Sequence, residues 1–181
     1  MKKDSRGGGH TITGLNFEKK VNLQAALASI PGYQIQKVAN KAGHHLLFKG
    51  KLVARCFKKH EFYEFLKENN IQWRKFVTRR LLPDDALLVV VRRTLFIIEM
   101  KYQQVSGSVD EKLQTSDFKK RQYTKLVSPL GLQVKYVYLL SNWFKKPEYA
   151  DVLDYIKDTG CHYFFNELPL IFLGLPEGEG H

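Results

Sequence analysis

The sequence predicts an α/β fold in which a mixed β-sheet is flanked by helices. Two continuous apolar runs rich in β-branched residues, 87–91 and 95–98, indicate central strands covered on both faces. Around them, the spacing of apolar residues gives the order helix, strands, central hairpin, helix, strand, helix, strand. The chain has 181 residues, 44% of them hydrophobic, which is enough for one domain with a buried core.

Each further element is predicted from its own pattern. Apolar residues at loose helical spacing predict a helix from Gly14 to Ile30, which Pro31-Gly32 ends. Arg92-Arg93 or Arg92-Arg93-Thr94 is short enough to be the turn of the central hairpin. A capping box at Ser108 opens a helix that Pro129 must end. The remaining predictions are strands at 33–38, 46–48, 52–57, 134–140 and 162–165 and helices at 60–69 and 149–158.

Composition predicts a single domain over residues 14–176, with a glycine-rich flexible arm at 1–13 and a tail at 177–181. Cys56 and Cys161 lack metal-ligand spacing, so we expect two free thiols in a cytoplasmic protein. No apolar run reaches the roughly 18 residues that span a bilayer, which predicts no membrane partner.

The net charge of +11 is divided unevenly along the chain. Residues 1–146 carry 28 Lys and Arg against 11 Asp and Glu, whereas residues 147–181 carry one Lys against seven acids. A solvated basic face is the simplest interpretation of such an excess. A phosphate backbone is the partner that this density of positive charge attracts most strongly, so the charge favours nucleic-acid binding.

Charged residues stand at the end of the central hairpin. Glu99 and Lys101 follow the second apolar run, and residues two apart in a strand share a face. Antiparallel pairing about either predicted turn brings Asp85 opposite Met100 or Lys101. We therefore expect Asp85 to meet the Glu99 and Lys101 pair.

Two carboxylates at the end of buried strands repel one another unless a cation compensates. Oxygen ligands favour Mg²⁺, with Mn²⁺ as a substitute, and Mg²⁺ takes one or two carboxylates together with water and phosphate oxygens. Such a site hydrolyses phosphodiesters, and Lys101 is suited to orient or deprotonate the attacking water. The alternative is a surface salt bridge between Glu99 and Lys101, with Asp85 as an ordinary turn residue.

The pattern Pro83-Asp84-Asp85, fourteen residues further Glu99-Met100-Lys101, resembles the signature of the PD-(D/E)xK nuclease superfamily. The resemblance implies a restriction-endonuclease-like core of order α-βββ-α-β, which residues 14–165 supply in a compatible order. It implies that Asp85 and Glu99 bind metal with the Met100 carbonyl, and that Lys101 acts on the water. Asp84 is the alternative ligand, because adjacent strand residues face opposite ways and only one can serve.

The resemblance also implies accessory residues at the site. Glu18, in the segment Gly14-Leu15-Asn16-Phe17-Glu18, is similar to an acid that the family's first helix brings to the metal, and an exposed carboxylate is its alternative. Gln103 shares the face of Lys101 and is a candidate catalytic residue, or else a polar strand end. The DNA-binding candidates lie in a possible recognition insertion at 46–80 and on the following helix: Lys58, Lys59, Arg74, Arg79, Arg80, Lys119, Lys120 and Arg121.

Among nucleases of this superfamily, a small basic stand-alone domain most resembles a type II restriction endonuclease. That resemblance implies a homodimer that cuts double-stranded DNA with Mg²⁺ and, since no P-loop is present, without a nucleotide cofactor. A nuclease similar to Holliday-junction resolvases or repair nucleases is the first alternative. A non-catalytic DNA-binding protein is the second.

Overall fold

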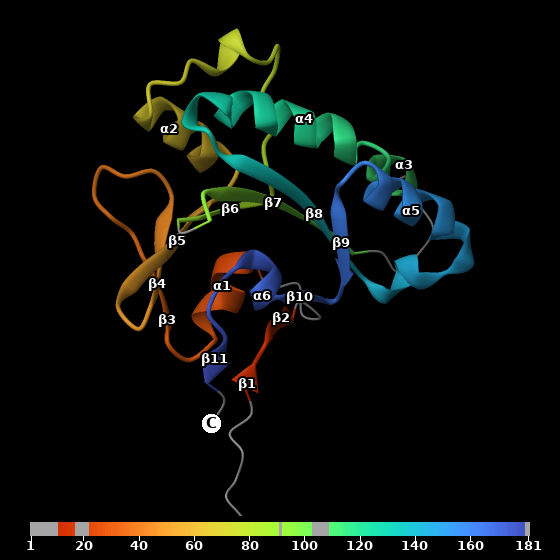
Figure 1. Cartoon of the computed structure of the whole chain (residues 1–181), viewed down its shortest axis with the longest axis horizontal. Coiled ribbons are helices and arrows are strands. Elements are labelled where there is room, and N and C mark those ends of the chain that lie inside the picture. The colour runs from red at the N-terminus through yellow and green to blue at the C-terminus, as the bar shows by residue number, and fades with distance from the viewer. Residues whose placement is uncertain (1–10, 17–21, 91, 103–108, 180–181) are drawn as a thin grey trace, which may run out of the picture.

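The computed structural model describes residues 11–16, 22–90, 92–102 and 109–179, and a seven-stranded sheet forms its centre (Figure 1). Strands β3 to β7 pair antiparallel, and β8 and β9 then add in parallel. The predicted mixed sheet is therefore confirmed. In spatial order the strands are β3 (Tyr33–Gln36), β4 (His44–Phe48), β5 (Lys51–Phe57), β6 (Asp85–Val89), β7 (Thr94–Lys101), β8 (Gln133–Leu140) and β9 (His162–Phe165).

Helices cover both faces of this sheet, as the two apolar strand runs predicted (Figure 1). One face packs on α2 (His60–Glu68), α4 (Ser116–Val127) and α5 (Ala150–Asp158), with Ile97 in that core. The other packs on α1 (Leu23–Ala28) and α6 (Leu170–Leu173), with Ile98 in that core. The shorter elements are α3 (Val109–Leu113) and the 3-10 turns η1 (Trp73–Lys75), η2 (Ser128–Leu130), η3 (Asn142–Lys145) and η4 (Pro147–Tyr149).

Two short ladders join segments from the two ends of the chain. β2 (Gly14–Asn16) pairs with β10 (Glu167–Pro169), and β1 (Thr11–Ile12) pairs with β11 (Gly178–Glu179). The predicted helix from Gly14 is therefore wrong at its start, because those residues take a strand partner about 150 positions away. The predicted arm and tail are corrected in the same way, since residues 11–12 and 178–179 belong to a ladder.

The central hairpin has a longer turn than predicted. Val89 pairs with Thr94, so four residues, 90–93, join the strands, and Asp85 lies opposite Ile98. The expectation that Asp85 faces Met100 or Lys101 is wrong, because each residue added to the turn shifts the register. Directly paired residues share a face, so Asp85 lies on the face of Ile98 and Met100, opposite to that of Glu99 and Lys101.

The remaining predictions agree with the described residues in most respects. The predicted helix after Ser108 is two helices, α3 and α4, and Ser108 itself lies outside the described residues. Within the predicted insertion at 46–80, residues up to Phe57 are strands of the main sheet, and the rest is α2, η1 and connecting chain. Cys56 and Cys161 are buried free thiols, as expected. No helix among the described residues is long and apolar enough to cross a bilayer.

Candidate active site at the end of the central hairpin

Three charged residues share the α4 face of the sheet where β6 begins and β7 ends. Glu99 and Lys101 project on the same side of β7, and the Lys101 Nζ lies 3.6 Å from Glu99 Oε2. Since Asp85 pairs with Ile98, continuing the ladder by one residue sets Asp84 opposite Glu99. Asp84 accordingly interacts electrostatically with both Glu99 and Lys101. The structure thus brings together Asp84, Glu99 and Lys101.

A second lysine reaches this cluster from α4. The Lys119 Nζ donates to Glu99 Oε1 at 2.6 Å, the shortest ion pair among the described residues. Sequence reasoning assigned Lys119 to DNA phosphates and missed this contact. Its helical spacing held a signal, because Lys119 shares a face with the buried Tyr123 and Leu126, and a lysine on such a face needs an anionic partner.

The second oxygen of the Glu99 carboxylate is buried close to a lysine. Oε2 lies 3.6 Å from the Lys101 Nζ, and no donor among the described residues meets it in good hydrogen-bond geometry. The buried hydroxyl of Tyr136, on the neighbouring strand, nevertheless acts on Glu99 as a hydrogen-bond donor that lowers its pKa. The residue is 9% exposed. An oxygen with no donor in good geometry is able to accept a further ligand that supplies positive charge.

The electrostatics of the cluster are set by burial and by its two lysines. Burial alone would raise the pKa of Glu99, but Lys101 and Lys119 outweigh it, and the pKa of Glu99 falls below its usual value. Desolvation raises the pKa of Asp84; Lys101 and Lys119 oppose this rise, whereas Glu99 adds to it. Glu99 is therefore ionised at neutral pH, with Asp84 as the exposed acid beside it.

Asp85 lies on the opposite face, toward α1. It is 3% exposed, and its carboxylate accepts a hydrogen bond from the backbone N–H of Leu23, the first residue of α1. Burial raises the pKa of Asp85 to about 7, although Lys58 acts in the opposite direction. The structure does not bring Asp85 together with Glu99 and Lys101.

The other residues predicted around the metal are placed as follows. The Met100 side chain packs in the core on the α1 side, away from Glu99 and Lys101, as the strand alternation predicted. The Lys101 carbonyl accepts from Ser141 on the β8 side, and successive carbonyls alternate between strand edges, so the Met100 carbonyl is directed toward the β6 edge. Glu18 and Gln103 lie outside the described residues.

The segment that leads into Asp84 is held at Leu81. The Tyr63 hydroxyl accepts from the Leu81 N–H at 2.9 Å and donates to its carbonyl at 3.1 Å. The Tyr123 hydroxyl donates to the same carbonyl at 3.2 Å. Helices α2 and α4 therefore both fix the chain three residues before Asp84, which restricts where its carboxylate can lie.

The predicted DNA-binding residues fall into three groups. Lys58 and Lys59 join β5 to α2 beside the two aspartates, and Lys59 lowers the pKa of Asp84. Lys120 donates to the carbonyls of Thr159 and Gly160 at the end of α5, and Arg121 pairs with Asp117 on its own helix. Arg74, Arg79 and Arg80 are exposed around η1.

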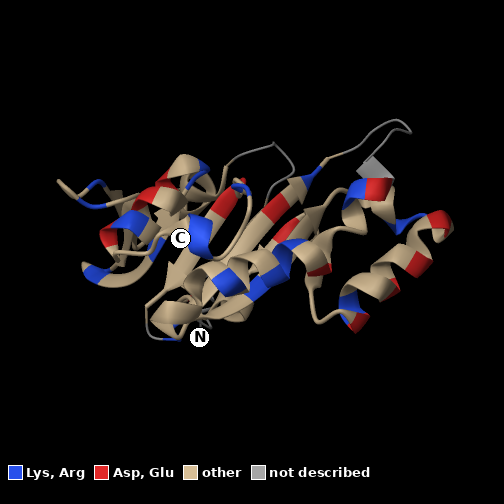
Figure 2. Cartoon of the chain, turned by 90° about the horizontal axis from the view of Figure 1, so that it is seen from above, with Lys and Arg blue, Asp and Glu red and all other residues tan. Residues whose placement is uncertain are grey.

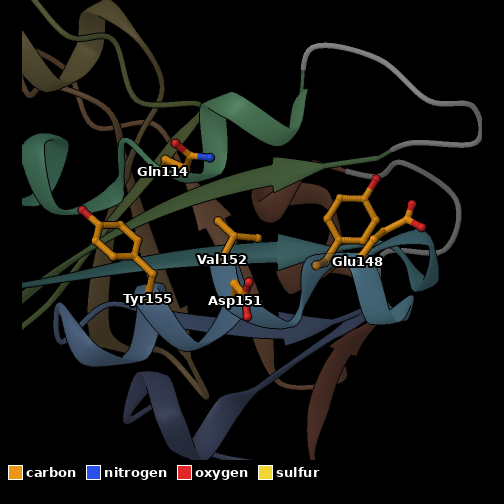
Figure 3. Close-up of a pocket in the computed structure, with 6 residues that line it drawn as sticks. Gln114, Glu148, Asp151, Val152 and Tyr155 are labelled. Carbon is orange, nitrogen blue, oxygen red and sulfur yellow. The ribbon is translucent and has the colours of Figure 1, made fainter.

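Charge is segregated over this surface. Seen from the α4 side, lysines and arginines gather along α4, and acids gather on α5 (Figure 2). A pocket of about 670 Å³ lies between the α3–α4 link and α5, lined by Gln114, Glu148, Asp151 and tyrosines (Figure 3). Its charged groups are acidic and would repel a phosphate, so this pocket does not belong to the predicted site.

Among the described residues, no three His, Cys, Asp or Glu side chains lie close enough together to hold a metal ion. The cluster itself contains two carboxylates, those of Asp84 and Glu99. Comparisons with models of protein families, with curated proteins and with solved structures find no match for this chain.

Proposed function

We propose that the protein is a metal-dependent DNA endonuclease that hydrolyses phosphodiester bonds at Asp84, Glu99 and Lys101. The observation that carries the proposal is the convergence of these residues on one face at the end of two central strands. The element order supports it: α1, then β5, β6 and β7 antiparallel, α4, and β8 parallel to β7 agree with the α-βββ-α-β core expected for PD-(D/E)xK nucleases.

The residues present fit a hard divalent cation. The Glu99 Oε2 atom, the Asp84 carboxylate and the Met100 carbonyl are oxygen donors, which Mg²⁺ and Mn²⁺ prefer. Mg²⁺ commonly takes one or two carboxylates and completes its shell with water and phosphate oxygens. When bound, the cation lowers the pKa of a water molecule and offsets charge on the phosphoryl oxygens.

The lysines supply the remaining chemistry. Lys101 is only partly exposed and stands 3.6 Å from Glu99, where its ammonium can orient the attacking water and donate to a phosphoryl oxygen as negative charge develops. Lys119 adds to the effect of Lys101 in lowering the pKa of Glu99, and it occupies the Oε1 atom, which leaves Oε2 for the cation. Both ammonium groups also favour the approach of a phosphate to a site that contains two acids.

Within this class we place the protein with type II restriction endonucleases acting on double-stranded DNA, a placement that rests on the sequence motif and on the net charge of +11. The homodimer that this implies remains a prediction. A junction-cutting nuclease would share the same three residues, so the choice of substrate must decide between them.

The test is cleavage of supercoiled plasmid, linear duplex and four-way junctions, with Mg²⁺ and with EDTA. We expect Mg²⁺-dependent cutting of duplex at one short sequence. Glu99→Gln and Lys101→Ala should lose cleavage at least a hundredfold, while Lys101→Ala still binds DNA in Ca²⁺. Lys51→Ala, at the exposed β4–β5 turn, is the matched control and should cut normally.

Retained cutting by Lys101→Ala, or cutting in EDTA, would contradict the assignment of the site. Preferential cleavage of junctions of varied sequence would instead move the protein to the junction-cutting class. DNA binding with no cleavage of any substrate would support a non-catalytic protein.

A further inference from the structure

A second pocket lies on the same side of the sheet, beside α2 and η1. It has a volume of about 350 Å³, and Tyr63, Ile71, Gln72 and Trp73 line it. The charged residues of its lining are Lys67, Arg74 and Arg80, all positive. The pocket therefore combines flat apolar surface with a cationic rim.

Planar groups are assembled around Trp73. The Tyr63 and Trp73 rings meet edge to face with centroids 5.9 Å apart. The Arg80 guanidinium lies 5.2 Å from the Tyr63 ring and 5.0 Å from the Trp73 ring, and that of Arg74 lies 4.7 Å from Trp73. Aromatic rings and guanidinium planes are the surfaces on which unpaired bases stack, and the same guanidinium groups bind phosphate.

A short stretch of chain connects the pocket to the candidate active site. Arg80 precedes Asp84 by four residues, so the two are at most roughly 14 Å apart along an extended chain. Tyr63, which forms a wall of the pocket, also holds Leu81 through both of its backbone polar groups. At a rise of about 3.4 Å per nucleotide, the Cα atom of Arg80 lies within roughly four nucleotides of that of Asp84.

We propose that this pocket binds an unstacked nucleobase, together with its phosphate, from the strand that is cut at Asp84 and Glu99. The inference rests on the proposed nuclease function. The base lies against the Trp73 and guanidinium planes, Gln72 offers an amide to the base edge, and Arg80 or Lys67 contacts the phosphate. Taking a base out of a duplex is unfavourable, and stacking of that base on Trp73 offsets this cost.

The test uses the small number of tryptophans in the chain. The sequence contains two, Trp73 and Trp143, so Trp143→Phe leaves Trp73 as the single fluorescent reporter. This variant is titrated in EDTA, where no cleavage occurs, with a short oligothymidylate and with an abasic oligomer of the same length and charge. We expect the oligothymidylate to quench Trp73 and to bind more tightly, since each stacked base adds about 5- to 150-fold in affinity.

Substitutions separate stacking from charge. Trp73→Ala should remove the preference for the oligothymidylate over the abasic oligomer, whereas Arg80→Gln should weaken both ligands. Lys51→Gln removes the same charge elsewhere and should have little effect on either. Equal quenching and equal affinity for the two oligomers, or no response to the oligothymidylate, would overturn the inference.

The experiment distinguishes failure of the pocket inference from failure of the nuclease proposal. If plasmid is cut with Mg²⁺ but Trp73 does not distinguish a base from an abasic site, the pocket inference fails alone. If Trp73 distinguishes them but no DNA is cut, the proposed hydrolysis fails and the base-binding pocket stands.

Discussion

Asp84 and Asp85 lie on opposite faces of the β6–β7 hairpin, in different environments. On the α4 face, exposed Asp84 stands with Glu99 and two lysines, and its carboxylate remains available to a ligand. On the α1 face, Asp85 is almost fully covered, and burial raises its pKa to about 7. The Asp84 carboxylate is therefore suited to binding a cation, whereas the Asp85 carboxylate is suited to attaching α1 to the sheet.

This contrast shows why a motif alone does not identify which aspartate lies beside Glu99. Side chains of adjacent strand residues project to opposite faces, so Asp84 lies in an ionic cluster whereas Asp85 lies in a hydrophobic core. The partner strand decides between the two residues, because the acid that shares the face of Glu99 is the one able to act with it.

The largest expected effect is on catalysis. Asp84→Asn should reduce DNA cleavage at least a hundredfold, because it removes a carboxylate ligand beside Glu99. Asp85→Asn should change the rate by less than about tenfold, because its carboxylate lies on the other face. Initial rates on plasmid at saturating Mg²⁺ measure both, with each variant checked for folding by circular dichroism. The reverse ranking would return the ligand role to Asp85.

The next effect is on stability, and it concerns Asp85. Its folded pKa of about 7 exceeds the roughly 3.9 of an unfolded aspartate, so the protein loses stability as pH rises from about 4 to about 7. Asp85→Asn removes this loss and should stabilise the protein by about 1–3 kcal/mol at pH 8 and by much less near pH 4.

Urea unfolding of wild type and Asp85→Asn at pH 8 and near pH 4.5 measures this difference. Asp151→Asn, an exposed acid of α5, is the matched control and should show little dependence on pH. A gain that is the same at both pH values would mean that ionisation of Asp85 is not its cause.

The smallest expected effect is on cation affinity at the α4 face. Lys119→Ala removes an ammonium group that competes for Glu99, so Mn²⁺ should bind about three- to tenfold more tightly in calorimetric titrations. Lys120→Ala is the adjacent control, because Lys120 bonds to carbonyls at the end of α5 and not to the cluster. Unchanged affinity in Lys119→Ala would show that the ion pair does not oppose metal binding.

Much of the fold follows from local pattern, and the rest depends on distant partners. The strands at 52–57 and 134–140 and the helices at 60–69 and 149–158 were predicted because their apolar spacing is determined within each segment. The strand at Gly14–Asn16 was missed because it depends on pairing with Glu167–Pro169. Local spacing carries no information about a partner so far along the chain.

The candidate site was predicted to a similar extent. Strand alternation alone brought Glu99 and Lys101 to one face, as found. Asp85 was predicted to join them, whereas the structure sets Asp84 on their face, because the register depends on the number of residues in the hairpin turn. The ion pair of Lys119 with Glu99 was missed because it requires the three-dimensional approach of α4 to β7, and its predicted contact with DNA stays a prediction.

The β1–β11 ladder brings together the two ends of the described fold. Its first and last strands are hydrogen-bonded neighbours, and both lie beyond α1, on the side of the sheet away from α4 (Figure 1). A short linker could therefore join them, and new ends could be opened at the exposed turn Lys49-Gly50 between β4 and β5. Such a circular permutant would keep the order β6, β7, α4, β8 uninterrupted.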